Sequence, residues 1–125
     1  MFRMLLIVGS GGFIGSAARY LGQIFINKYY PSSFPLGTFT INIVGCLLIG
    51  MIYAFSEKGN IMSPEVRMFL ATGFCGGFTT FSTFSYDILQ LLKDREILIA
   101  SGYISLSVFL GILAAYLGVI IVKAF

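Results

Sequence analysis

The chain has 125 residues, of which 58% are hydrophobic and 10% are charged, and its mean hydropathy is +0.94. A soluble domain carries about 25% charged residues. The composition therefore excludes an ordinary soluble protein and is typical of a membrane protein. No nucleic-acid partner is expected.

Charged residues are absent from four long runs, which are residues 4–18, 29–56, 68–86 and 97–122. A helix needs about 20 apolar residues to span a bilayer, and the first run continues beyond Arg19 to residue 27. We predict an all-α, multi-pass protein of the cell membrane, with membrane lipid around it. A single domain over residues 1–125 would contain four transmembrane helices, at about 4–27, 36–56, 64–92 and 97–123. The first is too long for the apolar core of a cleaved signal peptide, which is about 7–15 residues.

The first predicted helix is rich in glycine. Gly11 and Gly15 have the spacing that lets two helices approach closely in lipid. Gly9, Gly12 and Gly15 also match the glycine spacing of dinucleotide-binding enzymes. That motif requires a strand–helix–strand unit and an acidic residue about 20 positions later. The next acid is Glu57, so the chain is not predicted to be an enzyme.

Two polar residues in the first two predicted helices are candidates for contact with an ion. A charge at Arg19 costs about 2.5–3.5 kcal/mol at the centre of a membrane helix. Arg19 is therefore expected to face a water-filled path or a partner, or to extend to the membrane interface. The Asn42 amide can donate two hydrogen bonds, either to a dehydrated anion or to a neighbouring helix.

Residues 72–86, TGFCGGFTTFSTFSY, are the most informative stretch of the sequence. They include three glycines, four threonines, two serines and four phenylalanines, and no charge. Backbone that leaves a helix at membrane depth must be buried or line a cavity. We therefore predict a break in the third helix near Gly76-Gly77, next to the lining of a path.

Aromatic rings and hydroxyl groups follow this predicted break. Phe81 and Phe84 are three residues apart, so both rings can face one path. Acidic residues are absent from the central parts of the spans, since Asp87 lies near the end of its run; this suits an anion. The hydroxyl groups expected beside the path belong to Ser82, Thr83, Tyr103 and Ser107.

The two cysteines, Cys46 and Cys75, both fall within predicted spans, and the chain contains no histidine. Neither residue has the spacing of a metal ligand set. We expect both to act as small packing residues.

The cations are almost evenly divided between the two sides of the membrane. With four spans, one side carries Arg3, Lys58, Arg67 and Lys123, and the other carries Lys28, Lys93 and Arg95, or four cations if Arg19 is counted there. Topology normally follows a clear excess of loop cations on the cytoplasmic side. The balance reflects either the noise of counting in one sequence or dual topology, in which copies insert both ways and pair antiparallel.

The whole chain resembles the Fluc/CrcB fluoride channels. The resemblance rests on four spans in this length, on Arg19, on the Gly-Thr-x-Thr-x-Asn motif that ends at Asn42, and above all on residues 76–85. It implies a fluoride-selective channel that lets cytoplasmic fluoride leave by passive diffusion, built as an antiparallel, dual-topology homodimer. Asp87 and Gly111 depart from the family pattern, which often has Glu and Ser at these positions.

The resemblance also implies roles for individual residues. Phe81 and Phe84 would supply aromatic rings to the pore and Asn42 its amide, while Tyr103 and Ser107 would belong to a polar track. A structural Na⁺ would be held at the dimer centre by the backbone carbonyls of Gly76 and Thr79, which are the implied metal ligands. Ser82, Thr83 and Arg19 complete the expected ion pathway.

Two other classes of membrane protein are alternatives to a channel. Small multidrug exporters also have four helices, but they depend on a glutamate in the first helix, and this chain has no acid before Glu57. A structural subunit of a larger complex would have no use for the lining at residues 72–86.

Overall fold

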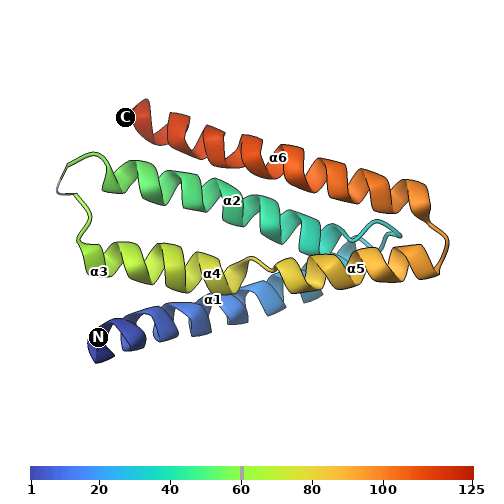
Figure 1. The fold of residues 1–125 in the computed structure, drawn as a ribbon, viewed down its shortest axis with the longest axis horizontal. Helices are drawn as coiled ribbons and strands as arrows, with labels where there is room; N and C mark the ends of the chain where they lie inside the picture. The colour runs from blue at the N-terminus through green and yellow to red at the C-terminus, as the bar shows by residue number, and fades with distance from the viewer. Residues whose placement is uncertain (60) are drawn as a thin grey trace.

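The computed structural model describes residues 1–59 and 61–125, and these form helices joined by short connections (Figure 1). Among them, three helices are long and apolar enough to cross a membrane: α1 (Phe2–Tyr29), α2 (Leu36–Ser56) and α6 (Ile97–Lys123). The all-helical class is confirmed. Asn60, in the second predicted connection, lies outside the described residues.

The segment between α2 and α6 is a long helical rod with one interruption (Figure 1). It contains α3 (Pro64–Arg67), the π-helix η1 (Met68–Cys75), α4 (Gly76–Phe78) and α5 (Phe81–Lys93). The side chain of Ser63 begins the rod by accepting a hydrogen bond from the Val66 N–H at 3.2 Å, as a helix N-cap does. The sequence predicted a broken helix here, and the structure has one.

The break lies at Thr79 and Thr80, a few residues beyond the predicted position at Gly76-Gly77. Both glycines are helical, whereas Thr79 and Thr80 have extended backbones with ψ of 156° and 116°. The Thr79 hydroxyl donates to a carbonyl one turn earlier, at 2.8 Å, and such bonds compete with the helical backbone. The Thr80 hydroxyl then accepts the Thr83 N–H at 3.1 Å, so Thr80 caps the start of α5.

Glycines let α1 approach the first half of this rod. A Cβ atom on Gly11 would lie 2.5 Å from the carbonyl oxygen of Phe69, and one on Gly77 would lie 2.5 Å from the carbonyl oxygen of Gly12. No side chain fits at these distances, so the two backbones are in direct contact. The packing role expected for Gly11 is therefore confirmed, and α1 holds η1 and α4 in place next to the break.

A second close contact joins α2 and α6, which lie side by side and run in the same direction (Figure 1). A Cβ atom on Gly50 would meet the carbonyl oxygen of Ala115, and one on Gly118 would meet that of Leu47. Small residues allow such contacts in a membrane, where hydrophobicity gives helices no drive to associate. The two contacts hold α2 and α6 together as a pair, and this pair lies opposite the break.

Candidate functional site

A pocket of about 450 Å³ lies next to the break. Its lining comes from α2, η1, α4, α5, α6 and the two residues of the break, and it contains no charged side chain. Six of the predicted site residues meet here, although they come from three separate stretches of the sequence. These are Asn42, Gly76, Thr79, Phe81, Phe84 and Ser107.

Asn42 joins α2 to the break by two hydrogen bonds to the backbone of Thr80. Its Oδ1 accepts the Thr80 N–H at 2.8 Å, and its Nδ2 donates to the Thr80 carbonyl at 3.1 Å. Both backbone groups of Thr80 are thereby satisfied at the place where the helix cannot satisfy them. An amide nitrogen has two N–H groups, so the second one can serve an anion in the pocket.

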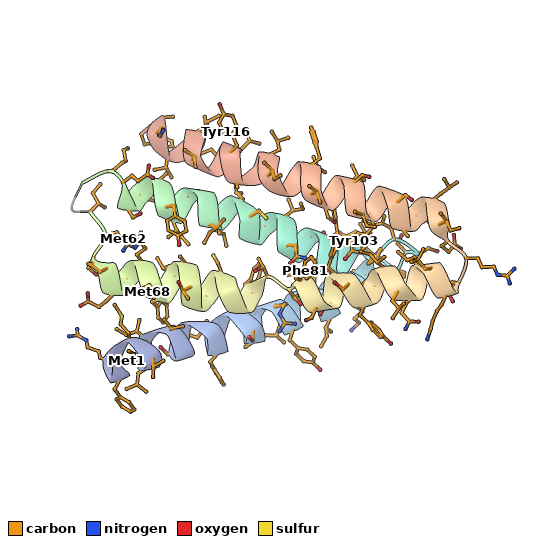
Figure 2. All side chains as sticks on the ribbon, in the orientation of Figure 1. Met1, Met62, Met68, Phe81, Tyr103 and Tyr116 are labelled. Carbon is orange, nitrogen blue, oxygen red and sulfur yellow. The ribbon has the colours of Figure 1, made fainter. Side chains whose placement is uncertain are left out.

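Phe81 and Phe84 lie on the first turn of α5, directly after the break. Their ring centroids are 5.7 Å apart and their planes are tilted by 42°. Phe81 is 78% exposed on the surface of the chain, and Figure 2 shows it beside the interruption of the rod. Phe84 turns inward, where its ring centroid is 4.9 Å from that of Tyr103.

Ser107 contributes a hydroxyl from α6. Its Oγ is buried and has no hydrogen-bond partner among the described residues. Buried polar groups almost always have a partner, and this one lines the pocket. The hydroxyl is therefore free to donate to a small anion or to water in the pocket.

Three predicted site residues lie beside the pocket rather than in its lining. Tyr103 is completely buried, and its hydroxyl donates to Asp87 Oδ2 at 3.0 Å. Thr83 Oγ1 accepts from Thr80 Oγ1 at 3.1 Å, and the hydroxyls of Ser82 and Thr80 are 3.3 Å apart. Tyr103 thus supports the Phe84 ring, while Ser82 and Thr83 share hydrogen bonds with the cap of α5.

Arg19 also lies outside the pocket lining, and it has a backbone partner. Its Nε donates to the carbonyl of Gly77 at 3.0 Å, and Ser16 Oγ donates to the same oxygen at 3.5 Å. That carbonyl would otherwise lack a helical donor, because the chain leaves the helix within one turn. The sequence showed a cation within a span but gave no sign of its partner, which is 58 residues away.

The carbonyls of Gly76 and Thr79 differ from that of Gly77. In the part of the chain that the structure describes, they receive neither a side-chain hydrogen bond nor a backbone hydrogen bond from outside the helices. Gly76 is exposed, and a Cβ atom there would meet nothing within 4 Å. Both oxygens belong to residues that line the pocket.

Comparison with known proteins places the chain in a family. Residues 6–119 match the model of the family described as CrcB-like protein, Camphor Resistance (CrcB). The "Fluoride-specific ion channel FluC" of Flavobacterium psychrophilum is 51% identical over 97% of this chain and 98% of that protein. Proteins of the same name from Chlorobium phaeobacteroides strain BS1 and Leptospira interrogans are 45% and 46% identical, each over 98% of this chain and over 94% and 97% of their own length. The resemblance seen in the sequence is confirmed, and the chain belongs to the CrcB family.

Proposed function

We propose that this protein is a fluoride-selective channel through which cytoplasmic fluoride leaves the cell by passive diffusion. The observation that carries the proposal is the uncharged pocket with unused donors, the Ser107 hydroxyl and the second N–H of Asn42. A pore must replace the tightly held water of fluoride with such donors and with the positive edges of aromatic rings. The names of the relatives agree with this function. No bond is made or broken, so the protein is not an enzyme.

A second copy of the chain is needed to close the path. The pocket reaches the surface beside Phe81, which is 78% exposed. An ion stripped of water would not be stable against lipid, because charges and polar groups at membrane depth require polar partners. We propose four spans per chain, with residues 64–93 as one broken span, and an antiparallel homodimer of dual topology. The balance of loop cations supports that arrangement.

A structural Na⁺ is proposed at the break, held by the carbonyls of Gly76 and Thr79 from both chains. The donor set fits, since these carbonyls lack other partners outside the helices and Gly76 lies open on the chain surface. Carbonyl oxygens suit a monovalent cation. Within the described ranges no group of three or more His, Cys, Asp or Glu side chains could hold a metal instead. The cation would hold the two breaks together and would not be transported.

Arg19 supports anion entry by its charge. Its guanidinium is bound to the Gly77 carbonyl, two residues before Thr79. A positive charge near a low-dielectric path raises the local concentration of anions. Arg19 therefore both stabilises the end of α4 and favours fluoride over cations.

The function is tested by reconstituting the purified chain alone into liposomes loaded with fluoride. We expect rapid fluoride efflux when a potassium ionophore compensates the charge, and no comparable efflux of chloride. Efflux should not require a proton gradient, since a passive channel has no coupling site. A multidrug-type exporter would transport organic cations in the same liposomes, and a structural subunit would transport nothing; either result would contradict the proposal.

If the channel is a dual-topology dimer, forcing every copy to insert in one orientation should abolish fluoride efflux. Adding three lysines to the connection at residues 93–96 biases that side towards the cytoplasm. Such a protein, expressed alone, is expected to lose at least about nine-tenths of its efflux, because antiparallel partners become rare. Co-expression with a copy biased by three lysines next to Lys58 should restore efflux. Full activity of one strongly biased copy alone would rule out the antiparallel dimer.

The aromatic pair is expected to affect transport more than assembly. Phe81→Ile or Phe84→Ile removes a ring edge from the pocket and should slow fluoride efflux by about tenfold or more, corresponding to about 1.4 kcal/mol or more. Phe13→Ile is a matched control, because Phe13 is 77% exposed on α1 and does not line the pocket. Size-exclusion chromatography should show the same dimer for all three variants. Normal efflux through dimers with either pocket substitution would exclude that ring from the path.

A further inference from the structure

We infer that Cys46 is a further residue of the ion pathway, one helical turn beyond Asn42 and Ser107. The inference rests on the proposed channel function and refines its path. Cys46 lines the same pocket as Asn42, Ser107 and Phe84, and its side chain is partly exposed. The sequence predicted a packing role for it, because nothing in the local pattern places its thiol next to a polar strip.

The position of the thiol follows from two helix faces. On α2, Asn42 and Cys46 are four residues apart and lie on one face. On α6, Ser107 and Gly111 have the same spacing, and the two helices run in the same direction (Figure 1). The Cβ of a side chain at Gly111 would lie 3.4 Å from the sulfur of Cys46. The thiol thus borders the space that a polar side chain on the next turn of α6 would use.

The chemistry of a thiol suits this position. Its S–H is a weak hydrogen-bond donor, and the neutral group carries no charge that would repel an anion. Gly111 has no donor in its side chain, so α6 offers no hydroxyl one turn beyond Ser107. The S–H of Cys46 can therefore donate a hydrogen bond to the ion at the level one turn beyond Ser107, where α6 has no hydroxyl.

The mutational test is a rescue across the two helices. Cys46→Ala is expected to slow fluoride efflux about fivefold, as befits the loss of one weak hydrogen bond to the ion. Cys46→Ser should remain faster than Cys46→Ala, because a hydroxyl also donates. Adding Gly111→Ser to Cys46→Ala should restore most of the lost efflux, since the missing sulfur leaves room for the new hydroxyl. Gly111→Ala in the same Cys46→Ala background is the control, because it fills the vacated space without a donor; equal rescue by Gly111→Ala would assign Cys46 a packing role only.

A second measurement uses the mercuric ion as a probe of access from water. The Cys75→Ala protein retains Cys46 as its one cysteine. Its thiol should bond to Hg²⁺ while the S–H proton passes to water, giving a mercury adduct by mass spectrometry. The adduct should block efflux of the Cys75→Ala channel, and the Cys46→Ala, Cys75→Ala double variant should be insensitive. Thiols that face lipid or lie in a packed core react slowly, because the reactive form is the thiolate.

The results distinguish a failure of the pathway role of Cys46 from a failure of the proposed channel function. Unchanged efflux of the Cys46→Ala dimer, or a loss of efflux in a stable dimer that Gly111→Ser does not restore, would overturn the pathway role of Cys46. If the unmodified protein carries no fluoride, the proposed function fails. In that case absence of a mercury adduct at Cys46 would also overturn its place in a water-accessible path. If Cys46→Ala does not assemble into a dimer, the efflux of the Cys46→Ser variant and the mercury adduct decide the role of Cys46.

Discussion

Fluoride efflux is expected to fall about 100-fold when Asn42 is replaced by alanine, because two hydrogen bonds to one broken backbone site are lost at once. The N–H and the carbonyl of Thr80 both depend on the Asn42 amide, at 2.8 and 3.1 Å. Each unpaired buried group costs about 1–3 kcal/mol, and the bilayer interior offers no replacement. The break should then collapse or fluctuate, and the donor at the pocket disappears with it.

The reason for the loss can be tested with two further variants. Asn42→Asp keeps an acceptor for the Thr80 N–H but has no N–H to donate, and its charge repels an anion, so it should also lose efflux. Gln23→Ala is the control, because the Gln23 amide donates to the hydroxyl of Thr38, at 3.2 Å, and to no backbone group among the described residues. That change leaves no backbone group unpaired and should have a small effect on liposome efflux. Normal efflux of the Asn42→Ala dimer would show that neither the double hydrogen bond nor the amide is needed.

Composition and local pattern were sufficient to predict the class of fold. Long charge-free runs require membrane helices, since spanning backbone must satisfy its own hydrogen bonds. Glycine spacing likewise predicted close helix contacts, and a Cβ atom on Gly11 would lie only 2.5 Å from a backbone oxygen of η1. The run at residues 72–86 predicted a broken helix because hydroxyls and glycines weaken helical backbone over a short stretch.

The position of the break could not be predicted from local pattern alone. Glycine is the commoner helix breaker in sequence rules, yet Gly76 and Gly77 are helical, because α1 packs against Gly77 and Arg19 binds the Gly77 carbonyl. Thr80 is extended because Asn42, 38 residues away, supplies its hydrogen bonds. Long-range partners of this kind are invisible to a pattern that extends over only a few residues.

The candidate site, too, was predictable in its residues but not in their arrangement. Asn42 and Ser107 could be selected in the sequence because polar residues are unusual within a membrane span, and Phe81 and Phe84 because hydroxyl residues are interleaved with them. Their meeting in one pocket depends on the contact between α2 and α6, which small residues of both helices set. Cys46 was missed as a lining residue for this reason, since its sulfur is placed by the absence of a side chain at Gly111, on another helix.

Replacing Na⁺ by a large organic cation on both sides of the membrane is expected to reduce fluoride efflux to the level of protein-free liposomes. The carbonyls of Gly76 and Thr79 receive no hydrogen bond from side chains or from backbone outside the helices in the described residues, and each orphan carbonyl at membrane depth costs several kcal/mol. A cation shared by two chains would satisfy four such oxygens at once, so its removal should loosen both breaks together.

The carbonyl ligands can be separated from the neighbouring hydroxyl. The Thr79 hydroxyl already donates to the Cys75 carbonyl at 2.8 Å, so Thr79→Ala should alter the stability of the break but keep the dependence of efflux on Na⁺. Efflux of the unmodified protein should return when Na⁺ is restored, whereas Na⁺ itself should not cross the membrane in a tracer flux assay. Unchanged efflux after thorough removal of Na⁺ would assign the orphan carbonyls to water or to hydroxyls of the second chain. Loss of the Na⁺ dependence in Thr79→Ala would instead show that the hydroxyl leaves its partner and binds the ion.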